Sequence, residues 1–146
     1  MTTAALDPAR FVRRQVAVAC AINAVLSAAF YFVVFGPEAT VTVGAPDRFA
    51  SDFPIQGAIV GLASALPPAL IARRAATSPA GFAPVVRWSV IGPAIGLAAG
   101  IVAFAALSMA GPTNLPIGLA VALKMTLGVL LALAVTPRAV NAGLRG

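Results

Sequence analysis

Four long apolar runs constrain this chain more than any other feature of its sequence. A helix that crosses a bilayer needs about 20 mostly apolar residues. In this chain of 146 residues, four runs reach about that length with hardly a charge inside them. They cover Val16 to Gly36, Pro54 to Ala72, Trp88 to Ala110 and Leu115 to Thr136. Buried helices of a soluble protein would be a poor explanation for four such runs. The sequence therefore predicts an all-α membrane protein whose four transmembrane helices form one domain over residues 1–146.

The composition supports this class and excludes another. Hydrophobic residues make up 60% of the chain and charged residues 10%, whereas a soluble domain carries about 25% charged residues. The net charge of +6 could suggest nucleic acid, but the arginines fall in short clusters beside the apolar runs. Such clusters orient membrane proteins. The lipid bilayer is therefore the expected partner, and nucleic acid is not.

The arginines also predict the topology. Eight of them fall on one side of a four-span arrangement, whereas the other side has Arg48 together with Glu38, Asp47 and Asp52. The eight are Arg10, Arg13, Arg14, Arg73, Arg74, Arg87, Arg138 and Arg145. Positive charge marks the cytoplasmic side, so we expect two helical hairpins with both termini in the cytoplasm. The first run is longer than the apolar core of a typical signal peptide and is expected to remain uncleaved.

The connection at residues 37–53, PEATVTVGAPDRFASDF, is the longest segment outside the apolar runs. Its VTV core is too short to predict more than one brief strand. Phe49 and Phe53 are expected at the bilayer surface, and a solvated connector is a better interpretation than a binding loop.

The two hairpins have similar sequences. VVRWSV at 85–90 resembles FVRRQV at 11–16, and LPIGLAVAL at 115–123 resembles FPIQGAIVG at 53–61. A duplication of two spans would preserve orientation in the membrane. Shared composition explains the similarity slightly better, because alanine, glycine and leucine match by chance in any two spans.

Small residues recur every four positions in three of the runs. The second run has Gly57 and Gly61, the third has Gly92, Gly96 and Gly100, and the first has Ala17 with Ala21. Spacing of four places each set on one helix face, and small residues let helix backbones approach closely in lipid. These faces predict tight packing, either within the chain or against a neighbouring subunit.

Lys124 is the chain's single lysine, and it lies inside the last apolar run. A helix rises about 1.5 Å per residue, which puts its backbone roughly 13 Å from the outer boundary. Depth counting places Ser27, Ser64 and Gly100 at the same level. An intramembrane charge costs at least about 2.5 kcal/mol and by default indicates function; structural glue between helices is an equally weighted interpretation.

Pro67 and Pro68 lie well inside the second run, and we expect them to break the helix there. Each removes an amide donor and frees the carbonyl four residues earlier, here those of Ala63 and Ser64. We therefore predict a polar layer in which Lys124 contacts these two carbonyls and binds an anionic or proton-coupled ligand.

Three more polar residues bear on this layer. Asp52 is the nearest carboxylate, and Lys124 should extend outward in its direction, although a direct pair requires Asp52 to dip toward the membrane or the outer face to be hydrated. Asn23 and Gln56 are better interpreted as interhelical hydrogen-bonding residues than as ligand contacts.

The sequence predicts no catalytic machinery. It has no histidine and a single cysteine, Cys20, so we expect neither a metal site nor a disulfide. The stretch GLASA at 61–65 lacks the closing glycine of a nucleophile elbow, and no phosphate-binding or dinucleotide motif occurs. An enzyme is not expected, and no cofactor is.

Two functional classes remain. One is an accessory or scaffold subunit that joins a larger membrane-protein complex, or a homo-oligomer, through its glycine faces. The other is an oligomeric conduit or carrier for a small anionic or proton-coupled solute that uses Lys124.

The segments AINAVLSAAF, SDFPIQGAIVGL and KMTLGVLLALAVTPRAV are similar to those of small uncharacterised four-span proteins of bacterial inner membranes. The resemblance covers most of the chain. It implies the same topology and an inner-membrane location, and no activity.

Overall fold

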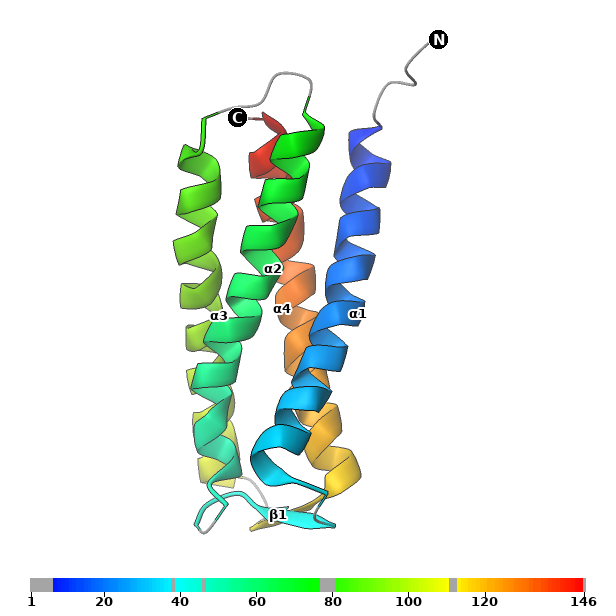
Figure 1. Cartoon of the computed structure of the whole chain (residues 1–146). Coiled ribbons are helices and arrows are strands. Elements are labelled where there is room, and N and C mark those ends of the chain that lie inside the picture. Colours follow the sequence, from blue (N-terminus) through cyan, green and yellow to red (C-terminus); the bar gives the residue numbers. More distant parts are fainter. Residues whose placement is uncertain (1–6, 38, 46, 77–80, 111–112, 146) are drawn as a thin grey trace.

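Four long helices account for most of the molecule (Figure 1). The computed structural model describes residues 7–37, 39–45, 47–76, 81–110 and 113–145. The helices are α1 (Pro8–Phe35), α2 (Phe53–Ala75), α3 (Ala83–Ala110) and α4 (Ile117–Arg145). Each is long and apolar enough to cross a membrane. The prediction of an all-helical multi-pass membrane protein is confirmed.

The helices extend beyond the predicted apolar runs. α1 begins at Pro8, where the Asp7 carboxylate accepts hydrogen bonds from the amides of Ala9 (3.0 Å) and Arg10 (3.3 Å). This is an N-cap followed by proline at the first helical position, a strong helix start. α1 ends before Gly36, whose φ of 70° favours glycine.

α4 continues through Pro137 to Arg145, beyond the predicted end at Thr136. Its last turns are buried against α2: a Cβ on Gly143 would lie 2.9 Å from the Ala72 Cβ, and Ala139 and Val140 are fully buried. Packing against α2 therefore maintains the helix past a residue that commonly ends one.

α2 and α4 form the centre of the bundle. α2 packs along both α3 and α4, and α1 packs mainly along α4, whereas α1 and α2 touch little. The first helix of each hairpin thus packs on the second helix of the other hairpin. This shared pattern is compatible with a duplicated arrangement, and the duplication itself stays a prediction.

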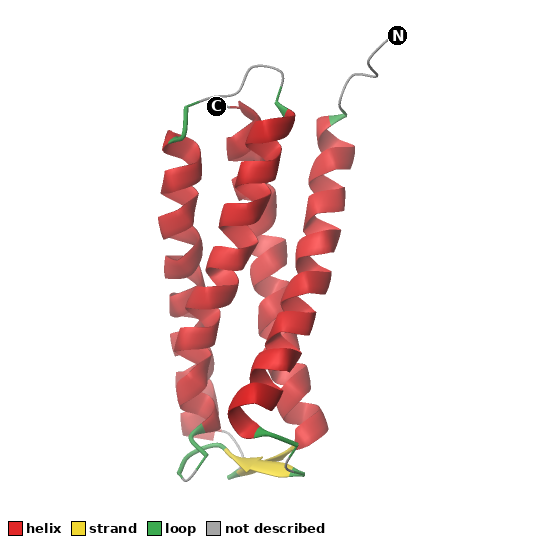
Figure 2. Cartoon of the chain, viewed as in Figure 1, coloured by secondary structure: helices red, strands yellow, loops and turns green. Residues whose placement is uncertain are grey.

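The two ends of the bundle differ in structure (Figure 2). α1 begins and α4 ends at one end, here named the terminal end. The opposite end, named the cap end, carries both short strands and the 3-10 helix.

The cap end is folded. Strand β1 (Thr40–Thr42) pairs antiparallel with β2 (Asn114–Pro116), with Val41 opposite Leu115. The 3-10 helix η1 (Phe49–Asp52) leads directly into α2. The strands therefore join the two connections at this end.

Local hydrogen bonds and burial hold this cap together. The Asp47 carboxylate accepts from the amide (2.7 Å) and hydroxyl (3.0 Å) of Thr42. Val41, Phe49 and Phe53 are each 2% exposed or less. The expectation that Phe49 and Phe53 lie exposed at the bilayer surface is wrong, because this connection has its own apolar core. Asp47, Arg48 and Ser51 stay exposed, as expected of a solvated connector.

Glycines join α2 to α3. A Cβ on Gly57 or Gly61 would lie closer than 3.0 Å to backbone atoms of Gly96 or Gly92, respectively, and one on Gly100 would meet the backbone of Phe53 and Pro54. Real Cβ atoms essentially never approach so closely. The predicted tight packing of these five glycines is thus within the chain. We call them the glycine seam.

Candidate functional site

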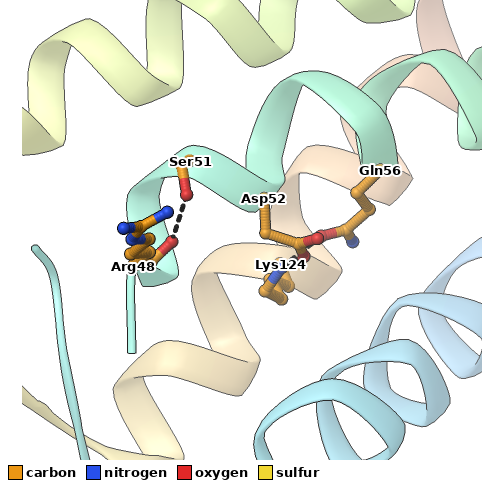
Figure 3. Close-up of polar contacts among 5 residues, drawn as sticks. All are labelled: Arg48, Ser51, Asp52, Gln56 and Lys124. Atoms are coloured by element: carbon orange, nitrogen blue, oxygen red, sulfur yellow. Dashed lines mark hydrogen bonds and ion pairs between the residues drawn. The ribbon is translucent and has the colours of Figure 1, made fainter. Parts of the chain in front are cut away.

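Lys124 is buried at the cap end of the bundle interior. Its side chain is fully covered, and its ammonium forms an ion pair with the Asp52 carboxylate and donates a hydrogen bond to Gln56 Oε1 (2.8 Å). Figure 3 shows Asp52 and Gln56 reaching Lys124 from one side of α2. These three residues are named the lysine cluster. Among the residues that the structure describes, Lys124 and Asp52 form the only salt bridge.

The chain places both partners of Lys124 by simple helical spacing. Asp52 ends η1 and occupies the N-cap position of α2, yet its side chain makes no capping bond to that helix. Gln56 follows four residues later and so lies on the same helix face. The carboxylate lies at the positive end of the α2 dipole. The Asp52 side chain thus pairs with Lys124 of α4 and does not cap its own helix.

Aromatic rings surround the ammonium group. Lys124 Nζ lies 4.9 Å from the ring centroid of Phe53, 5.1 Å from that of Phe49 and 5.2 Å from that of Phe35. A cation within about 6 Å of a ring centroid is attracted to the ring. The carboxylate, the amide and the three rings therefore complete the surroundings of a charge that would otherwise be costly in the membrane.

A second set of polar groups lies deeper in the bundle. Asn23 Nδ2 donates to Ser64 Oγ (2.7 Å) and to the carbonyl of Gly128 (3.5 Å), while Ser64 Oγ donates to the Val60 carbonyl (2.8 Å). Thr136 Oγ1 donates to the Ser64 carbonyl (2.9 Å). We call Asn23, Ser64, Gly128 and Thr136 the serine layer. It links α1, α2 and α4.

The predicted helix break at Pro67 and Pro68 is wrong, because α2 continues through both prolines from Phe53 to Ala75. The serine layer supplies a hydrogen bond to a carbonyl that the prolines free. Pro68 lies inside α2 and provides no amide for the Ser64 carbonyl. The hydroxyl of Thr136 donates the hydrogen bond that the missing amide would have given to this carbonyl. A carbonyl freed inside a membrane helix needs such a replacement donor. Ala63, whose carbonyl Pro67 frees, is half-buried between α1 and α2.

The structure separates the single layer that depth counting predicts. Lys124 lies with Asp52 and Gln56, and Gly100 lies against Phe53 and Pro54 at the same end. Ser64 belongs to the deeper serine layer. Ser27 adjoins Gly128, one turn beyond Lys124.

The predicted contacts of Lys124 with the carbonyls of Ala63 and Ser64 are wrong. Its side chain leans toward the helix N-terminus, as Cα–Cβ bonds do in any α-helix, and so reaches Asp52. The predicted direction toward Asp52 is confirmed, and so are the interhelical roles of Asn23 and Gln56.

Thr136 and Gly128 were missed in the sequence. Thr136 ends the fourth apolar run. Its hydroxyl could have been predicted as the donor to a carbonyl that a proline of α2 frees. Gly128 lies four positions before Ala132, so the same small-residue spacing could have been noticed in the fourth run. Its role is to let α1 approach: a Cβ there would lie 2.6 Å from Ser27 Oγ.

Two buried polar atoms lack a hydrogen-bond partner in the part of the chain that the structure describes: Ser27 Oγ and Gln56 Nε2. Both belong to residues no more than 1% exposed. Unpaired polar atoms weaken a bundle.

Comparison with protein-family models, with curated proteins and with solved structures finds no match for this chain.

Proposed function

We propose that this chain is a non-catalytic accessory or scaffold subunit of a membrane assembly in the bacterial inner membrane, with both termini in the cytoplasm. The observation that carries the proposal is the closure of the lysine cluster. Lys124 is fully buried and its charge is matched by Asp52. An ion pair of this kind holds helices in register and offers no free charge to a solute.

The docking surface that we propose differs from the one expected from the sequence. The glycines of α2 and α3 are used within the chain, so they are not free for a partner helix. Ala17 and Ala21 of α1, the remaining small-residue face, are exposed. Because small residues allow close helix contact in lipid, we propose that a partner helix packs on this alanine face.

Crosslinking in native membranes tests the scaffold. The tagged full chain is expressed in the source bacterium, crosslinked, solubilised in mild detergent and examined for size and co-purifying proteins. We expect a complex that Ala21→Leu reduces at least fivefold. Ala106→Leu, an equal change at an exposed position of α3, should leave it unchanged. A strict monomer without co-purifying protein would contradict the proposal.

A conduit or carrier is the second candidate, and one observation favours it. Asp52 keeps 15% of its side chain exposed at the cap end, so protons or small ions can reach one member of the lysine cluster. The purified chain in liposomes would then show flux that Lys124→Ala alters. Flux equal to that of empty liposomes removes this candidate.

The topology has its own test. A reporter that is active only in the cytoplasm should work when it is fused after Gly146, and a reporter that is active only outside the cytoplasm should not. The reason is that eight arginines lie on the terminal side of the four spans.

A further inference from the structure

A groove separates α1 from α2 on the side of the bundle where these helices touch little. It encloses about 230 Å³. Its walls are apolar: Val18, Ile22 and Leu26 from α1 face Ala63, Pro67 and Ile71 from α2. Several of these side chains are exposed, so the groove opens to the surroundings of the bundle.

The length of the groove matches one lipid leaflet. It extends along α1 from Gln15 to Leu26, which corresponds to roughly 16 Å at the helical rise. Half of a ~30 Å hydrocarbon core is about the same length. An acyl chain that enters from the terminal end would therefore fill it.

Positive charge lies at the mouth of the groove. Arg74 follows Pro67 by seven residues and Ile71 by three, which places it on the groove face of α2. Arg14 precedes Val18, at the rim on α1, by one turn. Both arginines are exposed, and they lie at one level because α1 and α2 run antiparallel, with Asn23 bonded to Ser64.

Two other charged residues at this end already have partners. The Arg73 guanidinium stacks on the Phe82 ring, 3.8 Å from its centroid, on the α3 side of α2. Asp7 is the described carboxylate at this end, and it caps the backbone of α1. The mouth of the groove is therefore complementary to an anionic group.

We propose that the groove between α1 and α2 binds an anionic phospholipid, with one acyl chain between the helices and the phosphate at Arg14 and Arg74. Basic pockets between transmembrane helices recognise anionic headgroups in this way. The proposal stands independently of the scaffold, because the alanine face lies elsewhere on α1.

Native mass spectrometry of the full chain in detergent, with added dioleoylphosphatidylglycerol or dioleoylphosphatidylcholine, tests the site. We expect the anionic lipid to bind at least tenfold more tightly. R14A/R74A should lower its affinity about 30-fold, since each arginine near a membrane surface contributes roughly a factor of five. The matched control R87A/R145A removes two charges at the same end and should change affinity less than threefold.

Three results would overturn the proposal. The first is equal binding of the two lipids. The second is an equal loss for both double variants, which would indicate general attraction to a positive surface. The third is unchanged binding in Ala63→Leu, which fills the groove. Thermal unfolding of each variant verifies that the bundle remains folded during the measurement.

Discussion

The glycine seam and the lysine cluster involve different faces of α2 and hold this helix to its neighbours by different interactions. Toward α3, α2 presents Gly57 and Gly61 and uses direct backbone contact. Toward α4, it presents Gln56 and Ser64 together with Asp52 at its start, and uses charge and hydrogen bonds. Close contact tolerates no added atom, whereas the polar contacts depend on complete pairing. The two interfaces should therefore fail in different ways.

The largest effect is expected for Gly96→Leu. The new side chain has only backbone atoms of Gly57 and Gly61 before it, and backbone cannot yield as a flexible side chain can. We expect more than about 3 kcal/mol of lost stability, the upper range for overpacking, measured by unfolding in mixed micelles. Gly118→Ala, where a Cβ meets nothing within 4 Å, should instead gain about 0.4–1 kcal/mol, because alanine lowers the entropy of the unfolded chain.

Breaking the ion pair comes next. Asp52→Asn leaves the fully covered Lys124 ammonium without a counter-charge, and such a loss costs about 3 kcal/mol. Lys124→Met should cost less, because Asp52 keeps access to water. The double variant should be milder than the sum of the two, by about 1–3 kcal/mol. Additive single effects would show that the pair contributes no coupling.

A smaller effect sharpens the role of the prolines. Thr136→Val removes the donor to the Ser64 carbonyl, at an expected cost of about 1 kcal/mol. Pro68→Ala restores an amide that can serve the same carbonyl. Thr136→Val should therefore cost about half as much in the Pro68→Ala background. An equal cost in both backgrounds would mean that Thr136 does not replace the missing amide.

The smallest effect concerns Ser27, whose buried hydroxyl has no partner among the described residues. Ser27→Ala should stabilise the bundle by about 0.5 kcal/mol, because an unpaired polar atom is removed. Ser64→Ala, which loses the bond from Asn23, is the opposite case and should cost about 1 kcal/mol. A loss of stability in Ser27→Ala would assign the hydroxyl a bonding role.

The sequence predicts most of the fold, because spanning a membrane demands long apolar helices and the chain can satisfy that demand in few ways. The contact face of the glycines was also readable, since spacing of four selects one side of a helix. The sequence could not show which helix the glycines contact, because glycine spacing is the same for packing within one chain and for packing between two chains.

The site was predicted only in part. Counting residues from span boundaries assumed straight helices that begin at the apolar edge, whereas α4 begins after β2 and Lys124 extends toward that end. The partner of Lys124 therefore lies nearer the surface than the count implied. The VTV segment indicated one brief strand, but its pairing with β2 could not be foreseen, since strands of three residues depend on each other and on Phe49 packed beneath them.

The sequence distance between Lys124 and Asp52, 72 residues, has a consequence for how the protein is made. Ribosomes add about 5–20 residues per second, so the carboxylate emerges roughly 4 to 14 s before its lysine. During that interval the first hairpin has a complete glycine face and no counter-ion. The fourth helix thus carries the charge that completes the lysine cluster, and a chain cut short before Lys124 should be recognisable to quality-control proteases as unfinished.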